Sequence, residues 1–272
     1  LVKHKYGFDK PIGTQYLYYL NDLSPISFHS KNENDYTFLN AKKYSAAPLF
    51  SIGNATTVLK FPYLRESFTK QGKKVSQVLA ETLPNTFVLA VSSIVIAMLL
   101  GVFLGILSAL KKDTFLDKSI QIFSTIGMSM PSFFSAILFA WIFGYVLHEY
   151  TNLEMTGSLY ELDDYGEKMY IKWKNLILPA IVLGIRPLAV IIQLMRNSLL
   201  EVFNQDYIRT ARAKGLSEFQ IIKNHALKNA LNPVVTAISG WFASMLAGAV
   251  FVEYIFGWNG LGKEIVNALN TL

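Results

Sequence analysis

The chain alternates between polar segments and four long apolar stretches. The apolar stretches lie at about 86–110, 119–147, 176–203 and 231–253, and few charged residues interrupt them. At about 1.5 Å of rise per residue, each is long enough to cross a hydrocarbon core of roughly 30 Å as a helix. One such stretch could be a buried helix of a soluble protein, but four in one chain predict a transmembrane domain over residues 86–272. We therefore expect an all-α membrane protein with four spans in this chain.

Residues 1–85 are more polar and predict a separate N-terminal region. Residues 7–22 could form a short helix, whereas residues 24–57 are rich in Ser, Asn and Lys, show no period and predict a loop. Before Pro84, side chains recur at helical spacing at Val75, Val78, Leu79 and Thr82. This spacing predicts an amphipathic helix that lies on the membrane surface and leads into the first span.

Charge in the connecting loops predicts which side of the membrane each loop faces. Loop 111–118 carries three lysines and loop 204–230 is also basic, so both should be cytoplasmic. Loop 148–174 carries more acids than bases and should lie outside. The alternation fits four consecutive spans and leaves residues 1–85 outside, which requires a span before them. Because the chain also begins with Leu, we expect it to be a piece of a longer protein.

Composition agrees with a membrane protein and narrows the chemistry. Hydrophobic residues make up 52% of the chain and charged residues 16%, which is apolar for a soluble chain of this length. The net charge of +6 could suggest nucleic acid, but much of the basic charge lies in short loops between spans. Cysteine is absent, so neither disulfides nor thiolate metal sites are expected.

Within the spans, a few residues depart from the apolar pattern. Pro131 lies in the second stretch, between Met128 and Met130 on one side and Phe133 on the other. Proline frees a backbone carbonyl, so this break indicates either the lining of a translocation path or a simple kink. Arg186 lies well inside the third stretch, where a charge must face protein or water. It could serve the path or pair with a partner inside the bundle.

Other residues in the apolar stretches have simpler interpretations. Gly101, Gly105 and Ser108 recur at a spacing that lets two helices approach closely, so we expect them at a packing contact. Glu253 lies at the outer end of the last stretch and is interpreted as an outer gate or a surface contact.

The basic loop at 204–230 is unusually elaborate for a connection between two spans. Asp206 suits the N-cap of a first short helix, and Gly215 suits the position after its end. Ser217 then caps a second helix, with Gln220 placed to complete a capping box. The first helix should pack through Tyr207, Ile208 and Ala211, and the second through Phe219, Ile222 and Ala226.

Three interpretations of this loop compete. A basic helix–turn–helix resembles a DNA-binding motif, but attachment to a membrane span at each end would keep it out of a DNA groove. A basic helix pair could instead lie on anionic lipid. The interpretation we favour is a short helix that is presented to a soluble cytoplasmic partner.

The residues of this loop also carry a family resemblance. Residues 206–217 (DYIRTARAKGLS) resemble the EAA-type loop of ABC importer permeases, in the form found in the peptide/nickel branch. The resemblance continues in residues 225–233 (HALKNALNP), 253–256 (EYIF) and 260–262 (GLG), and includes 83–86 (LPNT), 130–133 (MPSF) and 178–180 (LPA). It covers roughly residue 62 to the end. Residues 24–57 depart from it, since the family usually has a short Gly-Asp-Leu-Gly-Ser-like segment in that region.

The resemblance implies the transmembrane domain of a type I ABC importer, with six spans in the full chain, in the bacterial cytoplasmic (inner) membrane. It implies a second homologous permease, two cytoplasmic ATPases that bind ATP and Mg, and an extracytoplasmic substrate-binding protein; membrane lipid is the other expected partner. No cofactor is expected in this chain. The residues that match the ATPase-coupling helix are Tyr207, Ala211, Arg212, Ala213, Lys214 and Gly215.

Import of di- or oligopeptides by alternating access is the function that we expect, and this chain would not be an enzyme. Nickel or another small solute is an alternative cargo within the same family. An ion-coupled secondary transporter that uses Arg186 is a second alternative. A membrane enzyme using Glu161, Asp163 and Asp164 is a third, although nothing in the sequence places a nucleophile or metal ligands beside them.

Overall fold

The computed structural model describes residues 9–40, 43–163 and 165–271. The chain divides into two compact units, Leu1–Ala80 and Glu81–Leu272. The contact boundary therefore falls a few residues before the predicted boundary at residue 85. Each unit is described by itself below.

The first unit contains a helix and a small sheet. Helix α2 (Ile12–Leu23) precedes the strands β1 (Ile26–Ser30), β2 (Ala46–Ile52) and β3 (Ala55–Lys60), which form an antiparallel sheet in the order β1-β3-β2. The predicted loop over residues 24–57 is therefore wrong. Gly53, at φ +56°, and Asn54 make the two-residue turn between β2 and β3, a typical hairpin signal. The β-branched residues of β3 are a second sequence signal for a strand in this region.

A buried carboxylate organises the interior of the first unit. Asp22 accepts hydrogen bonds from Arg65 Nε at 2.9 Å, Tyr44 Oη at 2.7 Å and Tyr36 Oη at 3.2 Å. Burial, and then the Asp22 charge, raise the pKa of the Tyr44 hydroxyl far above its usual range. Val58 from β3 is also fully buried. The Asp22 contacts hold the end of α2 against the segments that flank the strands.

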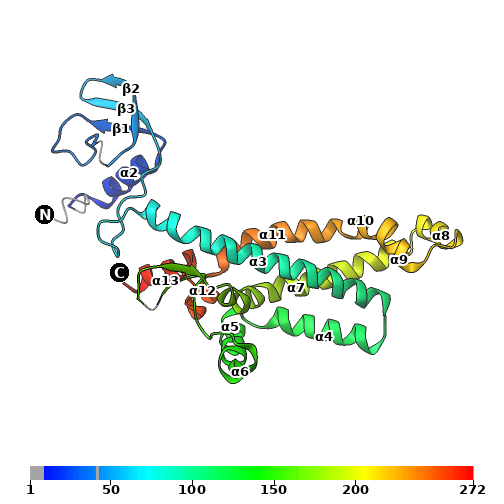
Figure 1. The fold of residues 1–272 in the computed structure, drawn as a ribbon. Helices are drawn as coiled ribbons and strands as arrows, with labels where there is room; N and C mark the ends of the chain where they lie inside the picture. The colour runs from blue at the N-terminus through cyan, green and yellow to red at the C-terminus, as the bar shows by residue number, and fades with distance from the viewer. Residues whose placement is uncertain (1–8, 41–42, 164, 272) are drawn as a thin grey trace. The chain divides into compact units, whose positions relative to one another are not determined.

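The second unit is mostly helical. Its long helices are α3 (Val75–Leu110), which begins just before the unit boundary, α7 (Lys174–Phe203) and α11 (Asn232–Gly248). The shorter elements are α4 (Phe115–Ser129), α5 (Ser132–Trp141), the π-helix η1 (Ile142–Val146), α6 (His148–Thr151), β4 (Tyr160–Leu162), β5 (Met169–Ile171), α8 (Asp206–Ala213), α9 (Glu218–Ile221), the π-helix η2 (Ile222–Ala226), α10 (Leu227–Ala230), α12 (Val250–Phe256) and α13 (Leu261–Asn270). The bundle carries α8 and α9 at one end and α12 and α13 at the other (Figure 1).

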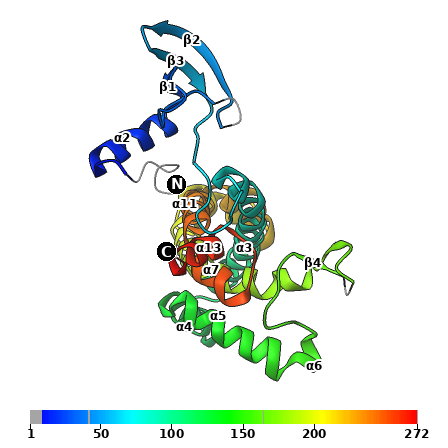
Figure 2. The same ribbon diagram turned by 90° about the vertical axis from the view of Figure 1, so that its left-hand side faces the viewer.

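Among the described residues, α3 and α7 are each long and apolar enough to cross a membrane. Two bent pairs, α4 with α5–η1 and α11 with α12, bring the number of candidate spans up to four, judged by length and composition. The second predicted stretch is not a straight helix, because α4 and α5–η1 meet at Pro131 with a bend of 109°. Figure 2 shows α3 and α7 nearly end-on, while α5 and α6 run across the view.

The predicted surface helix is not a separate element. Val75 begins α3, which continues without a break through Pro84 to Leu110. The amphipathic spacing therefore describes the first turns of the first long helix.

Helices α3 and α7 pack closely where the small residues of α3 lie. A Cβ added to Gly101 would lie 2.6 Å from Ile191 Cγ2, and one added to Gly105 would lie 2.6 Å from Met195 Cβ. Real Cβ atoms do not approach other atoms this closely, so only glycine fits. The predicted packing contact at Gly101 and Gly105 is confirmed.

Candidate functional site

Helix α8 begins one residue earlier than the sequence predicted. Gln205 is the N-cap residue and makes no side-chain cap, so the prediction of Asp206 as N-cap is wrong. Asp206 is the first helical residue, where a carboxylate still interacts favourably with the helix dipole. Its ion pair with Arg209, at 3.5 Å, is exposed and contributes little.

Gly215 ends the first helix as predicted. Its φ is +77°, a left-handed conformation that side-chain-bearing residues rarely adopt. Its N–H donates to Arg212 O at 2.9 Å, and Leu216 N–H donates to Ala211 O at 3.3 Å. A Cβ on Gly215 would meet nothing within 4 Å, so the conformation, and not the space, requires glycine here.

The capping box at the start of the second helix is confirmed. Gln220 N–H donates to Ser217 Oγ at 3.4 Å, and Ser217 N–H donates to Gln220 Oε1 at 3.0 Å. The α9, η2 and α10 segments then follow one another toward α11. Gly215 and this box together fix a sharp turn between two short helices.

One side of α8 is buried against the rest of the bundle. Ile208 and Ala211 lie in an apolar cluster with Leu199 and Val202 of α7 and with Ile221 of α9. Tyr207 is 41% exposed, and its hydroxyl accepts a hydrogen bond from Asn229 Nδ2 at 2.9 Å. The prediction was wrong for Phe219, which is 72% exposed instead of packed. The predictions for Ile222 and Ala226 are confirmed, and Ile221 is buried on the same side of the second helix.

The predicted coupling residues therefore fall into two groups. Ala211 is buried and attaches α8 to α7, whereas Arg212, Ala213, Lys214 and Gly215 are exposed. Arg212 Nε donates to Glu218 Oε1 at 3.1 Å, and its guanidinium lies 5.6 Å from the centre of the Phe203 ring. The exposed residues, with Tyr207, form the surface that a soluble partner could bind.

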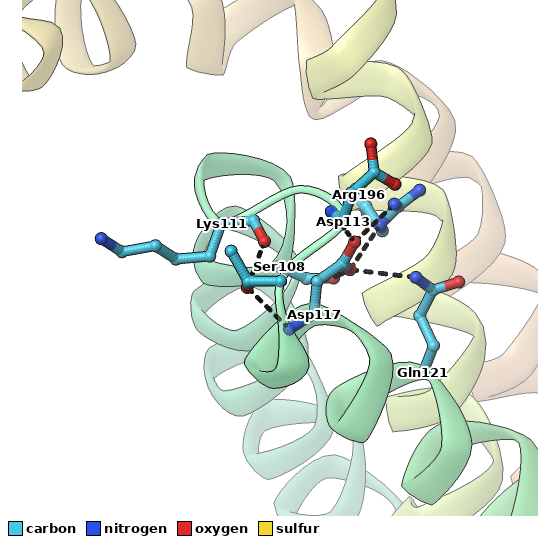
Figure 3. Close-up of polar contacts among 7 residues, drawn as sticks. Ser108, Lys111, Asp113, Asp117, Gln121 and Arg196 are labelled. Carbon is cyan, nitrogen blue, oxygen red and sulfur yellow. Dashed lines mark hydrogen bonds and ion pairs between the residues drawn. The ribbon is translucent and has the colours of Figure 1, made fainter.

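A buried ion pair, which the sequence analysis missed, lies near this end of the bundle (Figure 3). Arg196 of α7 donates to both carboxylate oxygens of Asp117 in α4, from Nε at 2.8 Å and from Nη2 at 2.7 Å. Their side chains are 13% and 1% exposed. A pair with two parallel hydrogen bonds is among the stronger polar contacts in proteins.

Three further groups complete the surroundings of Asp117. Its carboxylate also accepts hydrogen bonds from Ser108 Oγ, from Gln121 Nε2 at 2.9 Å and from the backbone N–H of Asp113 at 2.9 Å. Because Ser108 belongs to α3, the cluster joins α3, α4 and α7. The only sequence signal for this cluster was that Asp117 and Arg196, which carry opposite charges, both lie close to predicted cytoplasmic loops.

The residues predicted for a translocation path are only partly brought together. Met130 and Arg186 line one small cavity, of about 80 Å³, at the break between α4 and α5. Pro131 is the residue at the break, while Met128 and Phe133 do not line this cavity. The Phe133 ring lies instead 6.4 Å from the ring of Phe251. A role in transport for these residues stays a prediction.

Glu253, the predicted outer gate, is fully buried. Its carboxylate accepts hydrogen bonds from Thr86 Oγ1 and from the backbone N–H of Gly262, each at 2.6 Å, and from Lys263 N–H at 3.3 Å. A Cβ on Gly260 would overlap the carboxylate. The LPNT, EYIF and GLG segments thus meet around Glu253, which joins α3 to the first turn of α13. A gating role for Glu253 stays a prediction.

Glu161 and Asp163, two of the acids that were predicted to lie outside, do not form a catalytic group. Glu161 accepts hydrogen bonds from Lys172 Nζ at 3.1 Å and Asn175 Nδ2 at 2.6 Å, and Asp163 accepts from two backbone N–H groups of its own turn. Burial raises the pKa of Glu161, but the Lys172 and Asn175 hydrogen bonds outweigh burial and hold it below its usual range. Asp164 lies outside the described residues. No cluster of three or more potential metal ligands occurs in the described part of the chain.

Comparison with known proteins places these features in a family. The profile described as "Binding-protein-dependent transport system inner membrane component" matches residues 101–272. The chain belongs to this family. Its fold resembles that of a chain in the inward-facing MetNI methionine ABC transporter, with a TM-score of 0.54 over 72% of this chain and 87% of that one, at 17% identity.

Curated relatives of this permease family are peptide transport components. The chain is 37% identical over 208 residues to a putative peptide permease protein of Brucella suis, which covers 76% of this chain and 64% of the relative. It is 37% identical over 204 residues to the dipeptide transport system permease protein DppB of Bacillus subtilis, covering 75% and 61% of the two chains. It is 32% identical to the di/tripeptide permease protein DppB of Pseudomonas aeruginosa, covering 98% and 72%. The chain thus spans about two thirds of the length of such relatives.

Membership of the family settles two broader questions. The family is an inner membrane component, and the long apolar helices agree with that location. Its named relatives are permeases, which are transport components and not enzymes.

Proposed function

We propose that this chain is part of the membrane-spanning permease subunit of an ATP-driven importer of di- or oligopeptides. The peptide cargo rests on the relatives, whose names refer to dipeptide, di/tripeptide and oligopeptide transport. Nickel or another small solute would be carried by the same kind of fold, so uptake measurements must decide the cargo.

The observation that carries the proposal is the attachment of α8. Its buried residues Ile208 and Ala211 pack on the end of α7, while Arg209 and Lys214 remain exposed at the end of the bundle. A soluble partner that bound the exposed surface and moved would displace α8 and α7 together, because their contact is apolar and close-packed. Rigid-body movement of this kind can switch a transporter between inward and outward access.

The buried ion pair extends this attachment to two more helices. Asp117 and Arg196 join α4 to α7, and Ser108 adds α3. Movement of α8 would therefore be transmitted to three helices of the bundle.

The remaining chemistry falls to other chains of the assembly. The sequence has no glycine-rich phosphate loop that ends in Lys-Ser or Lys-Thr, so ATP and Mg would be bound by two cytoplasmic ATPases. A second permease would complete the path, and an external binding protein would deliver the peptide. Alternating access would be driven by closure of the ATPases on α8.

Replacement of Gly215 by Val tests the coupling. Val at a φ of +77° is strained by roughly 1–3 kcal/mol, so the turn after α8 must change. We expect ATP-driven uptake of radiolabelled dialanine into vesicles containing the complete assembly to fall about tenfold, given a strain of that size. The amount of chain inserted in the membrane should not change.

Gly72→Val is the matched control. Gly72 also has a φ of +77° with nothing within 4 Å, but it lies in the first unit, far along the chain from α8. Uptake by the control should stay near that of the wild type. Unchanged uptake by Gly215→Val would contradict the coupling role, and uptake driven by an imposed ion gradient without ATPases would favour a secondary transporter.

A further inference from the structure

The small cavity beside the break between α4 and α5 is lined by a charged residue. Arg186 is the only charged residue that lines it, and Ser132, Ser244 and Trp241 are among its other described lining residues. The volume of about 80 Å³ is enough for one small polar group and too little for a whole peptide. The cavity lies among α4, α5, α7 and α11, away from the Asp117–Arg196 pair.

The Arg186 guanidinium has no acidic partner within the part of the chain that the structure describes. A charge at the centre of a bilayer costs roughly 2.5–3.5 kcal/mol on insertion scales, so such residues normally have a partner or face water. Arg196, ten positions further along α7, shows the usual arrangement, because Asp117 binds it with two hydrogen bonds. Arg186 is thus available to an anion from outside the described chain.

Two hydroxyl groups in the cavity are available as well. Neither Ser132 nor Ser244 has a hydrogen-bond partner in the described structure, whereas Ser135 donates to Pro131 O at 3.3 Å. Ser132 is also the first residue of α5, where the leading N–H groups of a helix lack partners within it. Convergence of a few polar groups in a cavity is typical of ligand sites.

We propose that this cavity is a weak subsite for a carboxylate, and specifically for the C-terminal carboxylate of a peptide in transit. The inference rests on the proposed peptide transport. A guanidinium matches a carboxylate with two parallel hydrogen bonds, and the serine hydroxyls can donate to the remaining lone pairs. The side chains of the peptide lie outside the small cavity, so the contact does not depend on their sequence.

The absence of cysteine allows a direct test of the cavity. Ser244→Cys introduces the one thiol within residues 1–272, at the cavity wall, and its alkylation by a maleimide can be followed on a peptide of this segment. The experiment uses the purified complete assembly in detergent, without ATP, and compares excess trialanine with trialanine amide. N-acetyl-trialanine, which keeps the carboxylate, is the matched control for the other end of the peptide.

We expect trialanine and N-acetyl-trialanine to slow alkylation of the Ser244→Cys thiol severalfold, and the amide to leave it unchanged. Addition of Arg186→Gln should abolish this protection, and Arg186→Lys should retain part of it. A second reporter, Ser239→Cys, lies on the same helix outside the cavity and should show no protection by any peptide.

Three outcomes would overturn the subsite. These are equal protection by acid and amide, protection that survives Arg186→Gln, and absence of protection in the assembly with Arg186 intact. Absence of protection is the result expected if a carboxylate of the partner permease already binds Arg186. Because the readout needs neither ATP nor uptake, failure of the subsite and failure of ATP-driven transport are distinguishable.

Discussion

Helix α7 carries two arginines whose surroundings differ completely. Arg196 is buried and forms a two-hydrogen-bond pair with Asp117, in a cluster that also includes Ser108 and Gln121. Arg186 lines a cavity and has no partner among the described residues. The same residue type on the same helix therefore serves two purposes. The paired arginine holds helices together, and the other has no acidic partner in the described part of the chain, which is why we propose a binding role for it.

Arg196 and Arg186 lie at different places along the bundle, and the surroundings of the two places differ. Toward the end that carries α8, Arg196 is buried in a pair with Asp117, and Ile208 and Ala211 pack against α7. The break at Pro131 instead interrupts the regular helix and leaves polar groups of Ser132 and Arg186 available. Polar groups at membrane depth are tolerated where they line a cavity.

The largest expected effect comes from breaking the buried pair. Asp117→Ala leaves Arg196 buried without a counter-charge, so the thermal stability of the purified assembly should fall, by an amount equivalent to roughly 3–5 kcal/mol. Arg186→Gln is the matched control, since it removes an arginine of the same helix for which the described residues supply no partner. Its effect should stay within about 0.5 kcal/mol, as for most substitutions away from buried contacts.

The double variant Asp117→Ala with Arg196→Ala sharpens this comparison. It should lose less stability than the sum of the two single variants, because neither charge is left unpaired. Additive losses would show that the pair does not act as a unit. Equal losses in Asp117→Ala and Arg186→Gln would remove the distinction between the two arginines.

An intermediate loss of stability is expected from a substitution at the contact between α3 and α7. Gly105→Ala would place a Cβ 2.6 Å from Met195 Cβ, and overpacking of this kind costs about 1–3 kcal/mol. Gly240→Ala, in α11, is the control, because a Cβ there would meet nothing within 4 Å. Alanine favours a helix over glycine, so the control should keep or slightly raise the melting temperature. The order of the two melting temperatures is the measurement.

The smallest loss of stability is expected for the partly exposed ion pair of Lys172 and Glu161, whose side chains are 32% and 27% exposed. Lys172→Met should cost less than about 1 kcal/mol at neutral pH. Because the folded protein holds the pKa of Glu161 low, its contribution is present above the unfolded pKa of about 4.3 and fades as the pH falls. Thermal stabilities of wild type and variant should therefore converge in acid, and a constant difference would contradict the assignment.

Local signals in the sequence predicted local structure well. Gly215 and the Ser217–Gln220 box were found from capping preferences, because these depend on residues three or four positions apart. The contact of Gly101 and Gly105 was equally readable from spacing. Prediction was wrong at residues 24–57, where the turn at Gly53–Asn54 and the β-branched residues of β3 outweighed the polar composition.

Contacts between distant residues could not be read in the same way. Asp117 and Arg196 are 79 positions apart, and each looked like an ordinary charge near a loop. Glu253 was interpreted as an outer gate or a surface contact, and the surface contact is wrong, because the residue is buried and hydrogen-bonded to Thr86 and Gly262. Phe219 was assigned to the packed side because it lies three positions before Ile222, yet Ile221 and not Phe219 is buried beside Ile222.

The sequence by itself determined the membrane class, the long apolar helices, the sharp turn at Gly215 and the family. These follow from hydropathy and short-range preferences, which act between near neighbours. Only the tertiary structure decided which charges are paired, because pairing depends on where helices far apart in sequence come together. That is why Arg196 proved to be a structural residue held by Asp117, and why Arg186 has no acidic partner among the described residues.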